Sequence, residues 1–593
     1  MKLLCLKITD PKGFRSLQPG FEYRFRREWD IQEEQGFAPF ICAGPNGSGK
    51  SNLLEALAAI FYHLECIYLE NLPDSFRYDE DANPGGFRSD KAIPDGFELE
   101  YLIRPQDEMT VITNAGQAHV RIVKQPGEAP KWSLLSNDEQ KGPVDLIIGQ
   151  TMARQLLPDY VLGYSSGENE ILSLPFFKMR FVQFDEYWQA LKQQLPYPGR
   201  PESRLVYLDS GFSQAILLCN LLFQDADAHR PFSEDVKIEE LKEFRIIIRR
   251  SIEVGESQIP AFGSQDENKR ESIEEIVRNH PALTATEDEP PDKRYRVNLV
   301  QLLDGSETAD KIIPRLTRCA TCWYLDESND TLYLDYLVND ATRQAFRKNF
   351  DFEVNRSPIA LFQAFQVLLT FNLFSVSAPL KADLYRSGSH YVSETVPTLA
   401  SDERIMRFKF VKFRKTEVDE PVTLKNLSDG EHQLLHTLGL CLLFKNTQSL
   451  FLLDEPETHL NPDWRANFVS RLHESFNGSV GHEMLVTTHT PFLISDSTPE
   501  KVLAFKKADG VVSVSQPDYN TLGASINKIT MATFGKRETI GRHAQSKLER
   551  LRQRFEQGED KDQLIAEINR QLGDSVEKVL LIKTILDSME GQG

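Results

Sequence analysis

Residues 39–59 decide the fold of this chain, and they read PFICAGPNGSGKSNLLEALAA. Within them, residues 44–51 match the phosphate-binding pattern G-x-x-x-x-G-K-[ST] in full. The apolar residues 39–43 before the pattern predict a short buried strand, and the apolar positions from Leu53 onward predict a helix. Because a phosphate-binding loop requires a strand before it and a helix after it, this stretch predicts a nucleotide site.

The residue types in the loop suit a triphosphate. Glycines allow backbone N–H groups to point at phosphate oxygens, and the N-terminus of the following helix adds a partial positive charge. Lys50 can reach the β- and γ-phosphates, and the hydroxyl of Ser51 can ligate Mg²⁺. The expected cofactors are therefore ATP and Mg²⁺, and the expected contacts are Asn46, Gly47, Ser48, Gly49, Lys50, Ser51 and Asn52.

The composition of the chain is that of an ordinary soluble globular protein. Of its 593 residues, 40 % are hydrophobic and 26 % are charged, and there is no apolar run of about 18 residues that would predict a membrane span. The seven cysteines are dispersed, as expected for a protein of the reducing cytoplasm. A net charge of −20 argues against wholesale non-specific binding of nucleic acid, although it does not exclude a local basic groove.

A second anion site is predicted near residue 428. Residues 426–443 read NLSDGEHQLLHTLGLCLL, in which Ser428 and Glu431 form a capping box at the start of an apolar helix. The free N–H groups at the N-terminus of that helix, together with the Ser428 hydroxyl, suit a phosphate group.

Two apolar strands farther along the chain end in residues that carry chemistry. Residues 449–460, SLFLLDEPETHL, predict a strand that ends at Asp454 and Glu455. Residues 484–494, MLVTTHTPFLI, predict another strand that ends just before His489. We expect Asp454 to hold Mg²⁺, Glu455 to polarise the attacking water and His489 to donate a hydrogen bond to the γ-phosphate.

Taken in this order, the pieces resemble the ATP-binding-cassette (ABC) ATPases. The match is to the RecF/OLD-type, AAA_21-like branch, which also contains the SMC and zinc-hook repair ATPases, and not to the transporters. The resemblance covers roughly residues 1–65 and 420–500, with weaker support at 97–125. It includes Walker A, the signature, Walker B with its following glutamate, the D-loop and the His switch.

The resemblance implies a site shared between two copies of the chain. In the family, each ATP is gripped by the P-loop of one subunit and the signature of the other, in a head-to-tail dimer. Here Ser428, Asp429 and Gly430 would belong to the signature, which reads LSDGE where LSGGE or LSGGQ is more usual.

The sequence leaves two further family features undecided, the role of Arg15 and the identity of the Q-loop residue. Arg15, in the sequence Phe-Arg-Ser, would be a phosphate neighbour, although a surface charge is an equally good interpretation. The Q-loop residue of the family could be Gln150 or Gln183, or residues 164–170 could replace it.

The segment between the P-loop and the signature points to a smaller group within these ATPases. Lys50 and Ser428 lie 378 positions apart, yet the segment lacks the heptad repeat of a coiled coil. In this respect the chain is similar to the PtuA ATPases of Septu and retron-associated anti-phage systems, which work with a separate HNH nuclease. The implied partners are a second copy of the chain, such a nuclease and, in the retron case, a reverse transcriptase with its DNA or RNA; no membrane partner is expected. Residues 500–593 show neither a Toprim nor an H-N-H pattern, so the chain itself is not expected to cut nucleic acid.

The predicted fold class is α/β, an ABC-type P-loop ATPase with a mixed sheet and an antiparallel β subdomain. Residues 1–145 would form the lobe with Walker A and the antiparallel strands, and residues 416–515 the lobe with the signature, Walker B and His switch. Residues 146–415 predict a globular, mostly helical insertion, including a helix at 238–252. Residues 516–593 predict a helical region that either docks a partner or packs on the chain's own core.

Two rival functions fit the same motifs. One is a RecF/SMC-like DNA-repair or chromosome-maintenance ATPase that binds DNA directly, and the other is a scaffold that binds ATP and hardly turns it over. Residues 407–415, RFKFVKFRK, offer the first rival a phosphate-contacting strip, but an edge strand with a solvated face is the simpler interpretation. Cys319 and Cys322 form a C-x-x-C pair, for which buried thiols are the default and a zinc site the alternative.

Overall fold

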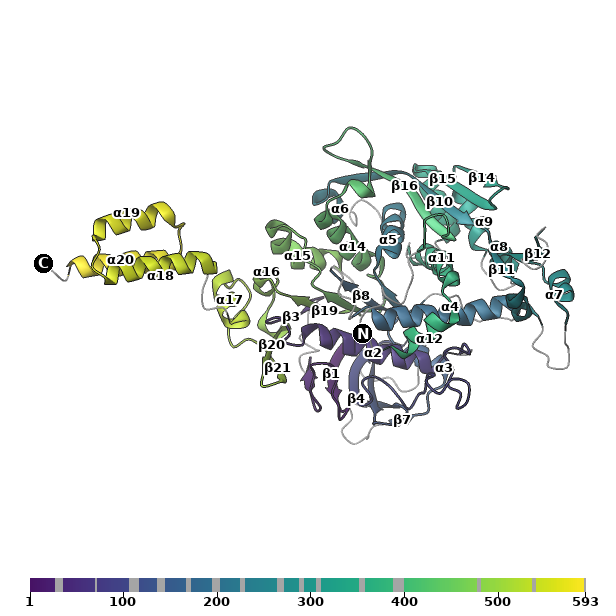
Figure 1. Ribbon diagram of the computed structural model, residues 1–593, viewed down its shortest axis with the longest axis horizontal. Helices are drawn as coiled ribbons and strands as arrows, with labels where there is room; N and C mark the ends of the chain where they lie inside the picture. The colour runs from purple at the N-terminus through teal and green to yellow at the C-terminus, as the bar shows by residue number, and fades with distance from the viewer. Residues whose placement is uncertain are drawn as a thin grey trace.

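The computed structural model describes residues 1–26, 36–69, 72–105, 117–135, 144–166, 172–194, 203–223, 230–263, 271–286, 293–305, 311–350, 358–387, 399–476, 481–535 and 540–590. Figure 1 shows their arrangement, with the large sheets in the middle of the molecule and the yellow C-terminal helices at one end.

The phosphate-binding stretch lies in a mixed central sheet with the order β21-β20-β3-β19-β18-β8-β9. Neighbouring strands run parallel, except for the antiparallel pair β20 and β21. Within β3, Phe40 and Cys42 face one core while Ile41 and Ala43 face the other, which explains why these strands read as continuous apolar runs. The strands are β3 (Phe40–Ala43), β8 (Val161–Ser165), β9 (Leu205–Tyr207), β18 (Leu450–Asp454), β19 (Glu483–Thr488), β20 (Val502–Ala508) and β21 (Val511–Ser515).

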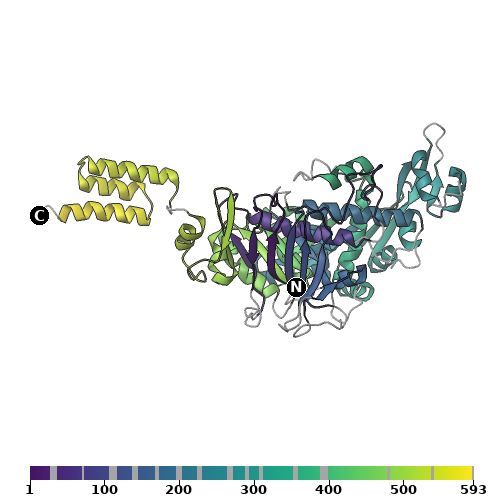
Figure 2. The same ribbon diagram turned by 90° about the horizontal axis from the view of Figure 1, so that it is seen from below.

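Helix α2 (Lys50–Ile67) separates this sheet from an antiparallel one. Its buried residues, among them Leu53 and Leu57, share one core with side chains of both sheets. The antiparallel sheet has the order β2-β1-β4-β5-β6-β7, and Figure 2 shows its strands from below. Its members are β1 (Lys2–Ile8), β2 (Glu22–Arg24), β4 (Phe97–Ile103), β5 (Ala118–Lys124), β6 (Lys131–Leu135) and β7 (Val144–Leu146). The predicted α/β class with an antiparallel subdomain is thus confirmed.

The insertion carries sheets as well as the predicted helices. One sheet has the order β14-β15-β10-β16-β17 and another the order β11-β13-β12. The strands are β10 (Ile238–Arg249), β11 (Ser251–Gly255), β12 (Leu283–Ala285), β13 (Arg294–Asn298), β14 (Cys322–Asp326), β15 (Thr331–Leu337), β16 (Met406–Lys415) and β17 (Val422–Thr423). The helices are α3 (Gln150–Leu156), α4 (Leu174–Lys192), α5 (Ser210–Phe223), α6 (Arg230–Glu234), α7 (Ile273–Asn279), α8 (Leu299–Gly305), α9 (Ile312–Cys319), α10 (Asp340–Phe350), α11 (Ile359–Thr370) and α12 (Ala378–Arg386). Because β8 and β9 belong to the central sheet, a boundary after residue 145 runs through the ATPase sheet and does not separate two domains.

Residues 238–252 form strands, so the predicted helix was wrong. Ile238, Leu241 and Phe244 are all buried and are spaced by three, as they would be on one face of a helix. In β10 this spacing has another cause, because its pairing with β16 is irregular on both sides of Leu241. Each irregularity inserts an extra residue into the strand, which changes the usual period of two into three.

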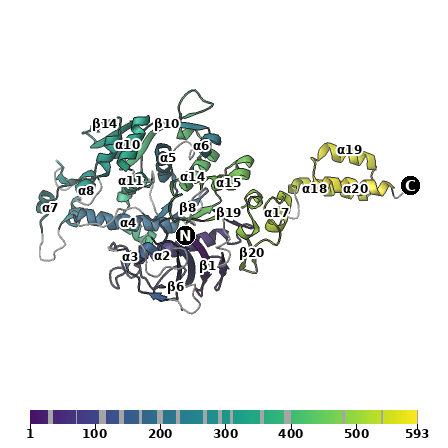
Figure 3. The same ribbon diagram turned by 180° about the vertical axis from the view of Figure 1, so that it is seen from behind.

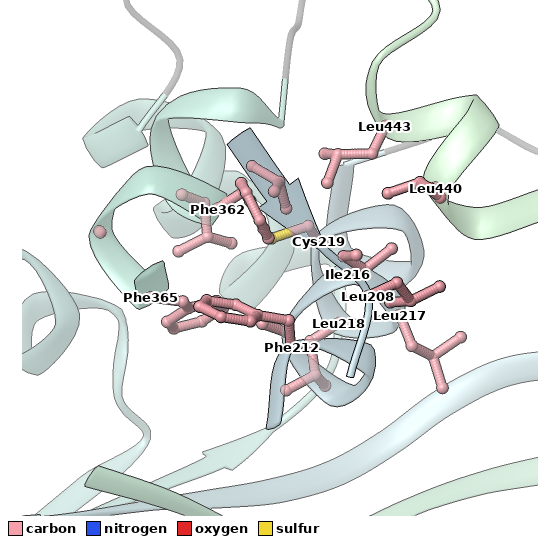
Figure 4. Packing of buried hydrophobic residues seen from close by; sticks show 14 of the residues in the cluster. Leu208, Phe212, Ile216, Leu217, Leu218, Cys219, Phe362, Phe365, Leu440 and Leu443 are labelled. Carbon is pink, nitrogen blue, oxygen red and sulfur yellow. The ribbon is translucent and has the colours of Figure 1, made fainter. Parts of the chain in front are cut away.

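The core of the insertion continues into the segment after residue 416. Figure 4 shows Phe212 and Ile216 of α5 packed between the α11 side chains Phe362 and Phe365 and the α14 side chain Leu440. Helix α14 (Asp429–Leu443) carries the signature sequence at its N-terminus. One core therefore supports both the insertion and the signature helix.

The C-terminal region continues from the central sheet through helices. Helix α15 (Pro462–Ser475), α16 (Pro491–Ser495) and α17 (Ile526–Phe534) pack on the core of the central sheet, in part through the buried Ile529. Helices α18 (Arg542–Glu556), α19 (Lys561–Gln571) and α20 (Val576–Glu590) have a small core of their own around Leu564 and Ile585. Figures 1 and 3 show this C-terminal helical unit (α18–α20) extending away from the ATPase beyond α17.

Helix length and apolarity give little indication of a membrane span in the described ranges. No single helix there has the length and apolarity that crossing a membrane requires. Only the bent pair Ile359–Ser375 and Ala378–Arg386 reaches that length and apolarity, and only when both segments are taken together. In the structure the helix α11 of that pair is packed in the core, with Leu361, Phe362 and Phe365 fully buried.

Two weaker sequence signals have plain structural explanations. The basic stretch 407–415 lies in β16, which is not an edge strand because it pairs with β10 and with the short β17. Its cations Lys412, Arg414 and Lys415 each pair with a glutamate, which weakens the interpretation as a phosphate strip. Cys319 is buried and Cys322 exposed, and no group of three or more metal-ligating side chains is found in the described part of the chain.

Candidate functional site

The phosphate-binding loop between β3 and α2 has the shape that its glycines permit. Gly47, at φ 72°, and Gly49, at φ 101°, both adopt the left-handed backbone. A Cβ atom on Gly49 would lie 2.9 Å from the hydroxyl oxygen of Ser16, so a larger residue would not fit there. The Ser48 hydroxyl is buried and has no hydrogen-bond partner among the described residues. A buried hydroxyl in this state, beside curled backbone N–H groups, fits an anion such as a phosphate.

Lys50 begins α2 and folds back over the loop. Its Nζ atom donates to the carbonyl oxygens of Gly44 at 3.0 Å and Pro45 at 3.1 Å. Burial lowers the pKa of this ammonium, while the neighbouring carboxylates of Glu455 and Asp454 raise it. A phosphate would be a stronger partner than these neutral carbonyls, because the hydrogen bond would then join two opposite charges.

Ser51 and Asp454 meet although 403 positions separate them. The Ser51 hydroxyl donates to Asp454 Oδ1 at 2.8 Å. The same oxygen accepts from Thr487 Oγ1 at 2.5 Å, because β18 and β19 are parallel neighbours with Asp454 opposite Thr487. Hydroxyl and carboxylate oxygens are ligands that Mg²⁺ prefers, so Ser51 and Asp454 are the residues that could hold this ion.

Glu455 and His489 form a pair at the same edge of the sheet. His489 Nε2 lies 2.9 Å from Glu455 Oε1, and both side chains are 35 % exposed. The hydrogen bond from His489 is the main cause that lowers the pKa of Glu455, so this side chain remains a carboxylate at neutral pH. Glu455 also has a left-handed backbone at φ 51°, and its N–H donates to Thr487 Oγ1 at 3.0 Å. A half-exposed carboxylate held in this way can accept a proton from water.

A second glutamate, Glu457, lies two residues farther along and is fully buried. Its Oε1 atom accepts a hydrogen bond from Thr488 Oγ1. Burial raises the pKa of Glu457 to about 7, the opposite direction to the shift at Glu455. The two carboxyl groups are therefore in different protonation states at mildly acidic pH.

The phosphate-binding loop, Glu455 and His489 surround one cavity of about 860 Å³. Its lining consists of residues 45–52 of the loop and helix, together with Glu455, His489, Pro491, Thr530 and Phe534. The size lies in the range of small-molecule sites. The predicted loop residues Asn46 to Asn52 are thus gathered with Glu455 and His489 around a single space.

The signature residues lie outside this cavity. Ser428 is the N-cap of α14 and accepts from the N–H of Glu431 at 3.3 Å, which is the predicted capping box. Ser428 and Asp429 are exposed, and Gly430 packs so closely on the His459 carbonyl that an added Cβ would lie 2.8 Å from it. Within one chain, the signature is therefore not brought to the P-loop.

Arg15 lies near the loop but faces a carboxylate. Its guanidinium forms an ion pair with the buried Glu55 at 2.8 Å, and its place beside a phosphate stays a prediction. The adjacent Ser16 hydroxyl donates to Asn52 Oδ1 at 2.6 Å, which connects this turn to α2.

The structure does not decide which residue takes the place of the Q-loop. Gln183 is buried in α4, and Gln150 begins α3. Ser165 ends β8 opposite Asp454, and the Asp454 carbonyl accepts from the N–H of the following Ser166 at 3.0 Å. The rest of that candidate, residues 167–170, lies outside the described residues.

Sequence reasoning missed several residues that position this site. Thr487 holds both Asp454 and Glu455, and the only hint was its place at the end of an apolar strand. Gln433 connects the signature helix to residues 457–460, where the resemblance places the D-loop, since its Oε1 atom accepts from the His459 N–H at 2.7 Å. Nothing in the sequence around Thr530 and Phe534 indicates that they line the cavity.

The fold and the site together define a P-loop ATPase domain. Residues 245–495 match a family model described as "AAA domain, putative AbiEii toxin, Type IV TA system". The matched range contains the signature, the Walker B strand and His489, and it begins after the P-loop.

Two curated proteins are similar to parts of this chain. Protein ea59 of Escherichia phage lambda is 28 % identical over 114 residues, which are 19 % of this chain and 21 % of that protein. The Retron Vc95 probable ATPase of Vibrio cholerae serotype O1 biovar El Tor is 23 % identical over 146 residues, which are 22 % of this chain and 28 % of that protein. The chain thus spans less than a third of the length of either relative.

Solved structures resemble the chain only distantly. The SMC head domain from Thermotoga maritima has a TM-score of 0.29 and 12 % identity, and the match covers 88 % of this chain and 100 % of that one. The recombination mediator protein RecF has a TM-score of 0.30 and 13 % identity, with 86 % of this chain and 97 % of that one covered.

Proposed function

We propose that this chain hydrolyses ATP and does so as a head-to-tail dimer that holds two ATP and two Mg²⁺ between its subunits. The observation that carries the proposal is the convergence of three distant segments on one cavity. Ser51 meets Asp454 at 2.8 Å, and Glu455 meets His489 at 2.9 Å, beside the phosphate-binding loop. A structural nucleotide site would need the loop but would not need a carboxylate–histidine pair aimed at it.

Each residue has a role in this proposal. Lys50 and the backbone of the loop neutralise and orient the phosphates, and Ser51 and Asp454 hold Mg²⁺, which offsets phosphate charge when it is bound. The Glu455 carboxylate accepts a proton from the attacking water. His489 donates a hydrogen bond to the terminal phosphate and in the absence of nucleotide keeps Glu455 in place.

The second half of each site comes from the other subunit. Ser428, Asp429 and the N-terminus of α14 are exposed, which leaves them accessible to a phosphate held by another copy. ATP binding then favours the closed dimer and hydrolysis releases it.

The biological role that we favour is control of an associated nuclease in a cytoplasmic anti-phage system of the Septu or retron type. It is supported by the partial similarity to a retron ATPase and by a globular insertion in place of a coiled coil. The alternative is a RecF/SMC-like repair ATPase that binds DNA directly. Co-purification with an HNH nuclease encoded next door would favour defence, whereas salt-dependent DNA binding by the purified chain alone would favour repair.

The central test is Glu455→Gln in the full chain. Because the amide cannot take the proton from water, we expect phosphate release to fall by about 10²–10⁴-fold. ATP binding should persist, so light scattering should show a dimer that accumulates with ATP. Glu500→Gln, a change of the same kind at an exposed position, is the control. Unchanged turnover in Glu455→Gln would exclude the proposed reaction.

A further inference from the structure

Helix α17 reaches the nucleotide cavity from the C-terminal region. Thr530 and Phe534, one helical turn apart, line the same cavity as the loop residues, His489 and Pro491. Phe534 is half-buried and packs against the main core, and its neighbour Met531 is exposed at 51 %. One face of α17 is therefore directed into the cavity and another into solvent.

The segment that leads into α17 is bonded to α16, and α17 itself packs on that helix. The Ser495 hydroxyl donates to the Ala524 carbonyl at 3.0 Å, and the Gly523 N–H donates to the Ser495 carbonyl at 2.8 Å. Ile529 is fully buried, and the Tyr519 and Thr533 hydroxyls are 2.8 Å apart. These contacts make α16 and α17 one packed unit.

Helix α16 connects this unit to the reacting end of the site. It begins at Pro491, two residues after His489, and Pro491 itself lines the cavity. Because α17 packs on α16, which begins two residues after His489, the α17 residues that line the cavity belong to the part of the lining next to His489. In the proposed function this side receives the terminal phosphate, whereas Ser51 and Asn52 mark the side of the inner phosphates.

We propose that α17 is a wall of the nucleotide site that contacts the terminal phosphate region of a nucleoside triphosphate. The Phe534 ring shields the reacting end from bulk solvent while leaving room for the one water that Glu455 activates, and the Thr530 hydroxyl offers a polar contact there. The wall is completed by a triphosphate and not by a diphosphate. The C-terminal helical unit (α18–α20) follows α17 in the chain (Figures 1 and 3). This inference rests on the proposed function.

The test compares Phe534→Ala with Met531→Ala, an apolar truncation on the solvent face of the same helix. The full chain is titrated calorimetrically with the Mg²⁺ complexes of ADP and of adenylyl imidodiphosphate, an ATP analogue that is not hydrolysed. We expect Phe534→Ala to weaken binding of the analogue about tenfold, through loss of packed contact, and to change binding of ADP less than about twofold. Met531→Ala should match the wild type for both ligands.

Other outcomes separate the two levels of the proposal. If the wild-type chain binds neither nucleotide, the proposed function fails. If it binds both, and Phe534→Ala binds the analogue as tightly as the wild type does or loses both ligands equally, only the role of α17 is excluded.

A second measurement covers the case in which Phe534→Ala does not fold. Hydrogen exchange of the wild-type chain should show that residues 526–534 gain protection with the analogue and not with ADP. Thr530→Val, which keeps the shape of the side chain, should lower the preference for the analogue over ADP. Equal protection of α17 with and without the analogue would overturn the inference.

Discussion

The two phosphate-binding regions of this chain differ in how much of a site each one forms alone. At the P-loop, Lys50 is buried, Ser51 already touches Asp454, and Glu455 already touches His489. At the signature, Ser428 and Asp429 are exposed, and the Ser428 side chain is engaged in capping its own helix. The first region is assembled from three segments of the chain, and the second is the N-terminus of one helix.

This difference indicates where affinity and where turnover originate. Hydrogen bonds across the parallel strands preorganise the P-loop region, so it can bind nucleotide within one subunit. A helix N-terminus alone contributes a modest electrostatic attraction. We therefore expect binding to depend on the first region and turnover to depend on both.

The largest effect that separates the two regions is expected for Ser428→Arg. A long cation at the tip of α14 would block the approach of another subunit, so turnover should fall by about 10²-fold, as when a transition-state donor is removed. Affinity of the monomer for ATP should stay within about twofold, because Ser428 lies outside the cavity of its own chain. Phosphate release and calorimetry measure the two quantities, with Ser401→Arg as the exposed control. Normal turnover in Ser428→Arg would contradict the shared site.

A smaller effect is expected for Lys50→Ala, on binding itself. Removing a charged donor to phosphate costs about 1.5–3 kcal/mol, so ATP affinity should fall by about 10- to 100-fold. Lys507→Ala removes an exposed lysine of β20 and should leave affinity unchanged. If Lys50→Ala binds ATP as the wild type does, the lysine does not contact the phosphates.

The smallest effect on the reaction is expected for Glu457→Gln. Its measurable effect is on how the free energy of unfolding depends on pH. Burial raises the pKa of this carboxyl from 4.5 to about 7, so its contribution to stability is complete below pH 4.5 and is lost as pH rises through 7. The glutamine lacks this dependence, and the variant should gain up to about 3 kcal/mol relative to the wild type between pH 4.5 and pH 7. Urea unfolding at several pH values measures the difference. A constant difference across this range would show that Glu457 titrates normally.

Much of the P-loop region could be predicted from the sequence because its signals are local. The loop pattern between an apolar strand and a helix located Lys50 and Ser51, and the strand that ends at Asp454 carried its own carboxylates. The Ser428 capping box also appears as predicted, because Glu431 lies three residues away.

The rest depended on partners that are distant in sequence. Thr487 acquires its role only when β19 lies beside β18, and Gln433 only when α14 meets the D-loop. The strand β10 was mistaken for a helix because its pairing irregularities imitate helical spacing. The sequence of α17 carries no phosphate-binding pattern, so its place in the cavity emerges from tertiary packing alone.

At Glu455 the requirements of folding and of the proposed chemistry conflict, because the residue that the chemistry needs has a left-handed backbone. A side chain at such a position costs roughly 1–2 kcal/mol that glycine would avoid. A descendant of this chain that no longer needed turnover would gain stability by acquiring glycine at position 455. That single position would therefore distinguish working copies from degenerate ones in a set of related genes.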